Sequence, residues 1–168
     1  MELKQYFLEQ VEREAATTRK TLERVPEGRT DWKPHEKSME LGYLASLVST
    51  MLGWVPLMVD RAELNLDAPS SDGFRPKAQV TRDDLLRQLE EATASARRSL
   101  EATTEEHLLK PWRFAMGGQT VSSGPRYVML GDALFSHLAH HRGQLTVYLR
   151  LNEAKVPAIY GPSADERF

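Results

Sequence analysis

The amino-acid sequence predicts an all-α protein built as a four-helix bundle, and two observations carry this prediction. Apolar residues recur every three or four positions through four long segments, which places them on one face of an α-helix in each segment. The intervening segments are rich in Pro, Gly, Ser and Asp, and little of the chain alternates as a strand would. Four amphipathic helices bury their apolar faces most simply against one another.

The first two helices occupy the N-terminal third of the chain. The first is expected over about residues 2–24, where Pro26 and Gly28 end it. Its inward stripe consists of Leu3, Phe7, Val11, Thr18 and Leu22. The second helix is expected to begin near Ser38, a favoured N-cap residue, and to continue to about residue 61. Pro56 lies inside this pattern and predicts a kink or a break followed by a short continuation.

The third helix follows a long connector. Residues 63–79 contain several Pro, Gly, Ser and Asp residues, and this composition predicts a loop. Thr81 is expected to cap the third helix, because Asp84 three positions later makes a near capping box. This helix is expected to extend to about Leu100.

The last third of the chain contains the longest helix. Residues 112–121 include two adjacent glycines, a pattern that fits either a small hairpin or an irregular loop. The fourth helix is expected to start near Pro125, a favoured first-turn residue, and to reach about Leu151. Residues 156–162 contain two prolines and a glycine, so we expect an extended tail over the bundle.

Length and composition fit a single domain spanning residues 1–168, which buries roughly 70% of its unfolded surface. The sequence has no cysteine, which excludes disulfides, cysteine-ligated zinc and a catalytic thiol of its own. The 22 basic and 24 acidic residues are interspersed and give a net charge of −2, unlike a nucleic-acid binder. We expect neither a signal peptide nor an apolar run of about 18 residues, and hence a cytoplasmic protein without nucleic-acid or membrane partners.

A histidine pair in the fourth helix is the clearest chemical signal in the chain. Residues 136–145 contain three of the five histidines, and His137 and His141 are four residues apart. That spacing projects both imidazoles from one helix face, where they can bind a single metal ion. The face is otherwise apolar and is expected to point into the core. Its members are Tyr127, Leu130, Leu134, His137, His141, Leu145 and Tyr148.

Three sequence blocks resemble the DinB/YfiT-like superfamily, bacterial four-helix bundles often described as metal-dependent enzymes. They are residues 31–42, 137–145 and 156–166, and the resemblance covers nearly the whole chain. It implies up-down-down-up topology and a homodimer. It also implies a metal site made of one histidine from the second helix and a His-x-x-x-His pair from the fourth. The pair carries over onto His137 and His141.

The third family ligand does not carry over, because Leu47 stands where the second-helix histidine would be. A catalytic zinc-type site uses three protein ligands and an open position, so two histidines alone predict weak metal binding. Glu14 lies in the apolar stripe of the first helix and could supply an oxygen ligand from there. In the alternative reading Glu14 leans out to solvent or pairs with a basic residue.

Other residues could line a pocket beside the histidine pair. Gln144 could orient a histidine, and the hydroxyl of Tyr148 lies one heptad after His141. Tyr43 lies one turn before Leu47 and is another candidate lining residue. His140 points about 80° away from the mean direction of the pair, which favours a supporting, interface or surface role. The simpler alternative for the aromatic residues is that they are core anchors.

Two functions of different classes follow from the resemblance. In the first, the protein is a divalent-metal-dependent transferase or hydrolase, using zinc, nickel or manganese with a small thiol or water as the reacting partner. In the second, it is a non-catalytic dimeric bundle or small-molecule-binding protein whose metal site is vestigial. The presence or absence of a third metal ligand distinguishes the two hypotheses.

Overall fold

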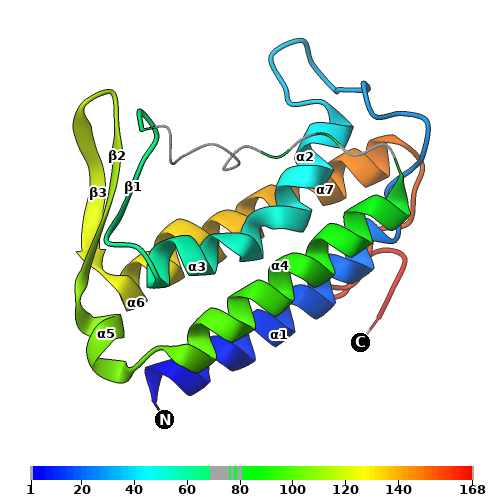
Figure 1. Cartoon of the computed structure of the whole chain (residues 1–168). Helices are drawn as coiled ribbons and strands as arrows, with labels where there is room; N and C mark the ends of the chain where they lie inside the picture. The colour runs from blue at the N-terminus through cyan, green and yellow to red at the C-terminus, as the bar shows by residue number, and fades with distance from the viewer. Residues whose placement is uncertain (1, 69–75, 77, 79–80, 168) are drawn as a thin grey trace.

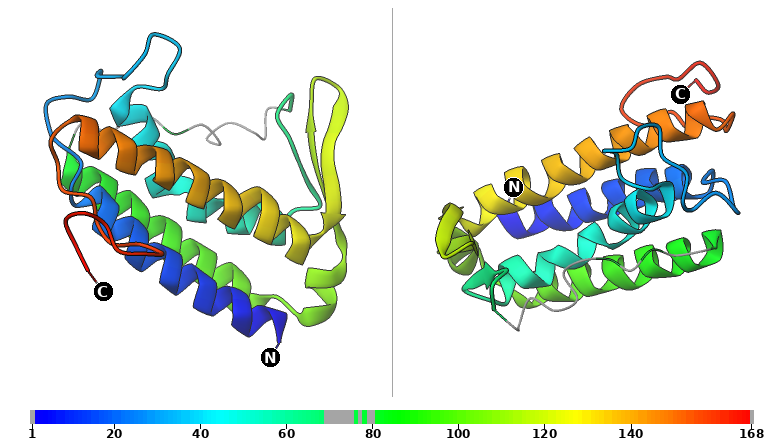
Figure 2. Two further views of the ribbon diagram at one scale, coloured as in Figure 1. Left: turned by 180° about the vertical axis from the view of Figure 1, so that it is seen from behind. Right: turned by 90° about the horizontal axis from the view of Figure 1, so that it is seen from above.

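The computed structural model describes residues 2–68, 76, 78 and 81–167. Its long helical segments lie side by side (Figures 1 and 2). They are α1 (Leu3–Leu22), the broken helix of α2 (Leu41–Thr50), η1 (Met51–Gly53) and α3 (Trp54–Val59), α4 (Arg82–Ala102), and the helix that ends in α7 (His137–Leu151). The first and last of these segments run in one direction, and the other two run in the opposite direction (Figure 1).

The hydrophobic core lies between these helices. α1 packs on α4, α2 and α7, while α2 and α3 pack on α4 from the other side. The α2 segment is the most central, because eight of its residues are buried. Leucines from every long helix are fully buried in the same core, including Leu22, Leu44, Leu100 and Leu138. This burial supplies most of the favourable free energy of folding.

The predicted all-α class is wrong, because the chain also forms a three-stranded mixed sheet. β1 (Glu63–Asn65) pairs in parallel with β2 (Pro111–Met116), and β2 pairs antiparallel with β3 (Gln119–Pro125). Gly117 and Gly118 make the β2–β3 turn with φ angles of +62° and +72°, a conformation that favours glycine. The sheet stands at one end of the helices (Figure 1). Its strand β1 comes from residues expected to be a loop.

The second long helix begins and breaks at different residues from those predicted. It starts at Leu41 rather than Ser38, because the connector backbone already satisfies its first amides. The N–H groups of Leu41 and Gly42 donate to the carbonyls of Trp32 and Thr30, each over 2.8 Å. The break comes at η1, ahead of Pro56. Pro56 is the third residue of α3, where a helix tolerates a missing N–H.

The N-cap of α4 is confirmed. The Thr81 hydroxyl accepts a hydrogen bond from the Asp84 N–H over 3.1 Å, and residues 83 and 84 place two acids in the first turn. The preceding connector is described only in part: β1 replaces loop at residues 63–65, and residues 69–75, 77 and 79–80 lie outside the described residues.

The fourth long helix changes its pitch in the middle. After Pro125 it runs as α6 (Arg126–Met129), then as the π-helix η3 (Leu130–Ser136), and then as α7. In η3 the Ser136 hydroxyl donates to the carbonyl of Gly131, five residues earlier, over 3.0 Å. A π-helix of this kind widens the turn, so it changes which side chains face each neighbouring helix.

Side chains from the sheet end of the molecule close the C-terminal end of α3. The short helix α5 (Glu105–Leu109), β2 and α6 each contribute one group that hydrogen-bonds a terminal carbonyl. The contacts are His107 Nε2 with Val59 O (2.7 Å), Trp112 Nε1 with Leu57 O (3.2 Å) and Arg126 Nη2 with Arg61 O (3.0 Å). Carbonyls left unpaired by the helix therefore gain partners, one of them a cation.

One stretch is apolar enough to resemble a membrane span, contrary to the expectation of no such run. Residues Leu41–Val59 form 19 residues of mean hydropathy 1.5, but 72% of the window is buried inside the fold. The described residues contain no second stretch of this kind. The burial is that of the core helix of a soluble protein.

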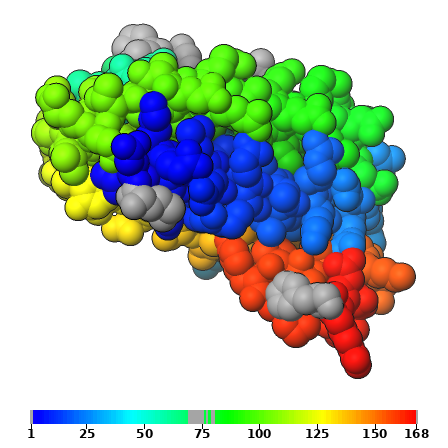
Figure 3. All heavy atoms as spheres, turned by 90° about the horizontal axis from the view of Figure 1, so that it is seen from below, coloured from blue at the N-terminus to red at the C-terminus, as the bar shows by residue number. Residues whose placement is uncertain are grey.

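The C-terminal tail lies against α1 and α7 without regular secondary structure (Figure 3). Carboxylates of the tail accept hydrogen bonds from backbone N–H groups of the same tail. The N–H of Val156 donates to Asp165 over 2.8 Å, and the N–H of Ala158 donates to Glu166 over 3.0 Å. Glu166 also forms an ion pair with Arg24 just after α1. The tail is therefore fastened to the helices at several points.

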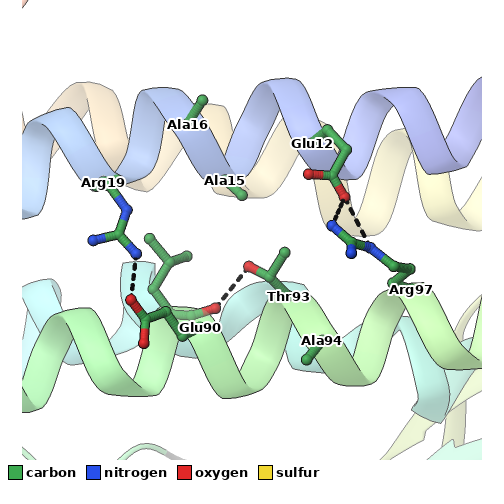
Figure 4. A pocket seen from close by; sticks show the side chains of 9 residues that line it. Glu12, Ala15, Ala16, Arg19, Glu90, Thr93, Ala94 and Arg97 are labelled. Carbon is green, nitrogen blue, oxygen red and sulfur yellow. Dashed lines mark hydrogen bonds and ion pairs between the residues drawn. The ribbon is translucent and has the colours of Figure 1, made fainter.

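A shallow groove of about 380 Å³ lies on the surface between α1 and α4. Figure 4 shows its small side chains with an ion pair at each end. The pairs are Glu12 with Arg97 and Arg19 with Glu90, and all four side chains are about half exposed. Exposed pairs of this kind contribute little stability, about 0–1 kcal/mol each.

Candidate functional site

The two histidines predicted as metal ligands meet at the start of α7. His137 Nε2 and His141 Nε2 lie 2.8 Å apart, and both rings are partly buried. The ring centroids are 4.5 Å apart and the planes are tilted by 44°. One turn of helix therefore delivers two ring nitrogens to the same point.

The remaining ring nitrogens are occupied by protein groups. His141 Nδ1 lies 2.8 Å from Gln144 Oε1, which is an acceptor. With this partner Nδ1 carries the hydrogen, so Nε2 keeps its lone pair and directs it toward His137. His137 in turn hydrogen-bonds the backbone of Ala133. Metal-ligating histidines characteristically hold their second nitrogen in this way.

The environment favours the neutral form of both imidazoles. Burial lowers the pKa of His137, and the nearby His141 and His140 rings lower it further, while the Ala133 hydrogen bond acts in the opposite direction. Burial also lowers the pKa of His141, against the raising effect of the Gln144 hydrogen bond. A neutral imidazole is the form that binds a metal ion.

The surroundings of the pair are apolar on the side of the second long helix. The Trp54 ring at the start of α3 lies 5.6 Å from the His137 ring. Leu47, which stands at the position of the missing family ligand, is buried in α2 with 8% of its surface exposed. Among the residues that the structure describes, no group of three or more His, Asp or Glu side chains is placed to hold a metal ion.

Glu14 is buried, but its partner is a basic residue. Glu14 Oε2 lies 2.6 Å from Arg142 Nη2, and both side chains are almost completely buried. The Tyr160 hydroxyl donates to the same carboxylate oxygen over 2.8 Å, and Gln10 donates to the other over 3.0 Å. The structure therefore places Glu14 in an ion pair between α1 and α7, away from the histidines.

The sequence indicated Arg142 only as a residue that could pair with an unspecified acid, and it gave Tyr160 no place in this cluster. Arg142 also donates to the hydroxyls of Thr17 and Thr18 over 2.8 and 2.9 Å. One signal in the sequence could have indicated this cluster. Glu14 and Arg142 are charged residues at inward positions of their helices, and buried charges of opposite sign tend to pair. Tyr160 lies in the tail and gave no comparable periodic signal.

The other predicted pocket residues lie on α2 and α7. Tyr148 is buried, and its hydroxyl donates to the carbonyl of Met39 over 3.1 Å. Tyr43 is half-buried on α2. His140 is exposed, with its ring centroid 5.0 Å from that of His141. Of the predicted set, Gln144 is the residue in hydrogen-bond contact with the pair.

The pair fits a divalent ion as two ligands of a larger set. Zinc–nitrogen bonds of about 2.0–2.1 Å require two nitrogens within about 4 Å of each other, and the Nε2 atoms satisfy this limit. Both Nε2 atoms point to the same place and share one proton in their hydrogen bond, so release of that proton would make both of them metal donors. Among the described residues, no third His, Asp or Glu side chain joins the pair, so any further ligand of a bound ion would come from outside them.

Comparison with known proteins agrees with this fold. The family model described as the DinB family matches residues 1–167, so the chain belongs to the DinB family. An uncharacterized protein of Bacillus subtilis (strain 168), YrdA, is 28% identical over 161 residues, covering 96% of this chain and 90% of that protein.

Two solved structures share the fold. A DinB-like protein from Bacillus cereus ATCC 10987 superposes with a TM-score of 0.69 at 20% identity, covering 92% of this chain and 95% of the other. The DinB-like protein YjoA from Bacillus subtilis gives a TM-score of 0.67, also at 20% identity, covering 89% and 94%. At this identity the likeness establishes the fold alone.

Proposed function

We propose that His137 and His141 bind a divalent metal ion such as zinc, nickel or manganese, and that the protein is a metal-dependent transferase or hydrolase. The observation that carries the proposal is the convergence of the two Nε2 atoms at 2.8 Å. Gln144 holds the second ring nitrogen of His141, and the backbone of Ala133 hydrogen-bonds His137, so both rings are fixed in orientation. This is the arrangement that metal-ligating histidines adopt.

The bound metal would lower the pKa of a coordinated thiol or water and so generate a nucleophile at neutral pH. The chain's own contribution is to hold and orient. His137 and His141 supply neutral nitrogen donors, and Gln144 fixes the tautomer of His141. Trp54 packs beside His137 and excludes water from that side of the pair. Because the protein has no cysteine, a reacting sulfur would come from a small thiol cosubstrate.

Direct measurement of metal binding tests this proposal. Titration calorimetry with zinc, nickel and manganese, together with metal content by plasma mass spectrometry, should give about one equivalent per chain. His137→Ala and His141→Ala should each abolish this binding, because one imidazole alone is a weak ligand. Gln144→Leu should weaken it by about 10–100-fold, the usual effect of removing a group that orients a ligand. His140→Ala is the matched control and should bind as the parent does.

Leu47→His tests the position of the missing ligand. If α2 presents residue 47 to the pair, this variant should tighten binding by at least about tenfold, which is about 1.4 kcal/mol. Unchanged affinity would contradict the idea that α2 faces the pair in the family geometry. A parent protein that binds none of the three metals would contradict the metal-dependent function itself.

One observation favours a second candidate, a non-catalytic dimeric or small-molecule-binding protein with a vestigial metal site. The described residues add no third His, Asp or Glu to the pair, and the apolar Leu47 stands at the family position. Under this hypothesis the metal-free protein is fully folded and shows no thiol-transfer or hydrolytic activity with added metal. Light scattering on the purified protein separates a homodimer from a monomer in the same preparation.

A further inference from the structure

A second cavity lies on the other side of the long C-terminal helix from the histidine pair. It measures about 350 Å³ and opens between α1 and the helix formed by η3 and α7. On this side Phe135 stacks on Phe7 of α1, with ring centroids 6.0 Å apart. The histidines are directed to the second long helix instead, where His137 meets Trp54. The cavity is therefore a separate place from the candidate metal site.

The cavity combines aromatic walls with polar ends. Phe7 and Phe135 form the stacked wall, and Tyr6 adds its ring edge-on to Phe7 at 5.2 Å. Asp132 and Ser136 line it from η3. Because these two rings stack on each other, the wall offers an apolar surface for a hydrocarbon body rather than an open ring face for a cation.

The charges around the cavity leave one carboxylate uncompensated. Glu14, which lines one end, is neutralised by its buried ion pair with Arg142. Arg13 near the same end bonds Gln10 and forms a pair with Glu9 at 3.8 Å. Asp132 is exposed, and no ion pair to it occurs within the described part of the chain. The cavity is therefore acidic by about one charge.

The helix geometry at the cavity is a second and independent observation. The cavity is lined by four residues of η3, namely Gly131, Asp132, Phe135 and Ser136. A π-helix is rare because its packing is poorer than that of an α-helix, and such segments occur frequently at functional sites. Here the widened turn brings an acid, a hydroxyl and an aromatic ring to the same opening.

We propose that this cavity binds a small organic ammonium ion, an amine attached to an aromatic or short alkyl body. Asp132 supplies the counter-charge, and the Phe7 and Phe135 rings contact the apolar body. The Ser136 hydroxyl accepts an N–H hydrogen bond. An anionic ligand does not fit, because Arg142 directs its guanidinium inward to Glu14, Thr17 and Thr18.

Three probes of one shape and different charge test the proposal on the purified full chain. They are phenethylamine as the ammonium ion, phenethyl alcohol as the neutral form and hydrocinnamate as the carboxylate. Calorimetry at pH 7 should detect the amine and find the other two at least about tenfold weaker, since the charge-assisted bond to Asp132 is lost. Amide chemical shifts should locate the amine beside η3 and the first half of α1.

Two variants complete the test. Asp132→Asn removes the proposed counter-charge from an exposed position and should weaken amine binding by at least about tenfold. Glu12→Gln removes an acid from α1 in the groove of Figure 4, which lacks aromatic walls, and should leave binding unchanged.

Other results of these experiments would contradict the proposal that the cavity binds an ammonium ion. Equal binding of amine and alcohol, preference for the carboxylate, or no binding of the amine at millimolar concentration would each overturn the proposal. So would an Asp132→Asn variant that binds the amine as the parent does. His141→Ala should retain amine binding, so failure of the metal-dependent function and failure of this proposal give different results.

Discussion

Arg142 is the largest of the fully buried side chains, and its charge is met by one carboxylate, that of Glu14. Desolvation of two such charges is costly, and their mutual attraction with the surrounding hydroxyl contacts offsets it. The pair links the middle of α1 to the middle of α7. Because the partners are 128 residues apart, the pairing belongs to the tertiary structure and could not be derived from helical periodicity.

Removing one partner of this ion pair should be strongly destabilising. Arg142→Met leaves the Glu14 carboxylate buried without its cation, and the expected cost is about 3–5 kcal/mol in the free energy of unfolding. The double variant Glu14→Leu, Arg142→Met removes both charges and should recover much of that loss. Urea unfolding at pH 7 measures each value.

The exposed pair of Arg19 and Glu90 is the matched control. Arg19→Met should cost less than about 1 kcal/mol, because solvent screens that pair. A buried-pair variant that loses no more stability than this control would show that the cluster contributes nothing specific to folding.

At the scale of elements, local signals and long-range contacts had different predictive value. The Thr81 cap could be predicted because both partners lie within one turn. The adjacent Gly117 and Gly118 indicated a turn, although they left hairpin and loop open. β1 could not be predicted, because its three residues gain strand pairing only from β2, about 50 residues away. Its sequence has no strand pattern of sufficient length.

The junction of α3 with the sheet depends on Arg126, a cation for which the described part of the chain provides no ion-pair partner. Arg126 is buried and hydrogen-bonds the carbonyls of Arg61, Lys110 and Pro111. Burial lowers the pKa of its guanidinium. Arg126→Met should remove the side-chain donors to these carbonyls, while Lys110 keeps the backbone N–H of residue 126 as a partner, and should cost about 1–3 kcal/mol in unfolding free energy.

Hydrogen exchange of α3 and β2 should report this loss locally, with faster exchange there than in α1. Arg113→Met is a suitable comparison, because Arg113 lies on the exposed face of β2 and pairs with Glu63 at the surface. An Arg126 variant with the stability of the Arg113 variant would contradict the proposed role in closing α3.

At the scale of the whole molecule, the tail links the C-terminal end of α7 to the C-terminal end of α1, through Asp165 with Arg150 and Glu166 with Arg24. The arrangement could be expected in outline, since two prolines and a glycine exclude regular helix over residues 156–162. The partners that hold the tail on the helices could not be predicted, because Arg24 and Glu166 are far apart in sequence. The same reason explains why the histidine pair was predictable from its spacing whereas the burial of Glu14 against Arg142 was not.

The tail should detach in acid before the helices unfold. The Arg150 hydrogen bond, with the Val156 N–H, lowers the pKa of Asp165, and the Ala158 N–H, with Arg24, lowers the pKa of Glu166. Because both folded-state pKa values are depressed, the stabilisation is present above the unfolded values of about 3.9 and 4.3. It is lost as pH falls through the lower folded values.

Amide shifts and hydrogen exchange of Val156 and Ala158 between neutral and acidic pH measure this release. In Asp165→Asn the Val156 amide should already exchange faster at neutral pH. Release in the parent well above pH 5, where both carboxylates are ionised, would contradict the assignment to these acids.

The widened turn of η3 sets the rotational phase of everything that follows it. If the same seven residues adopted ordinary α pitch with none deleted, His137 and His141 would turn by roughly 100° relative to α6, because the wide turn takes up about one extra residue. Such a change of pitch would leave every ligand in the sequence and still move both imidazoles away from Trp54. In this protein the pitch of one helical segment therefore determines the site as much as the identity of its side chains does.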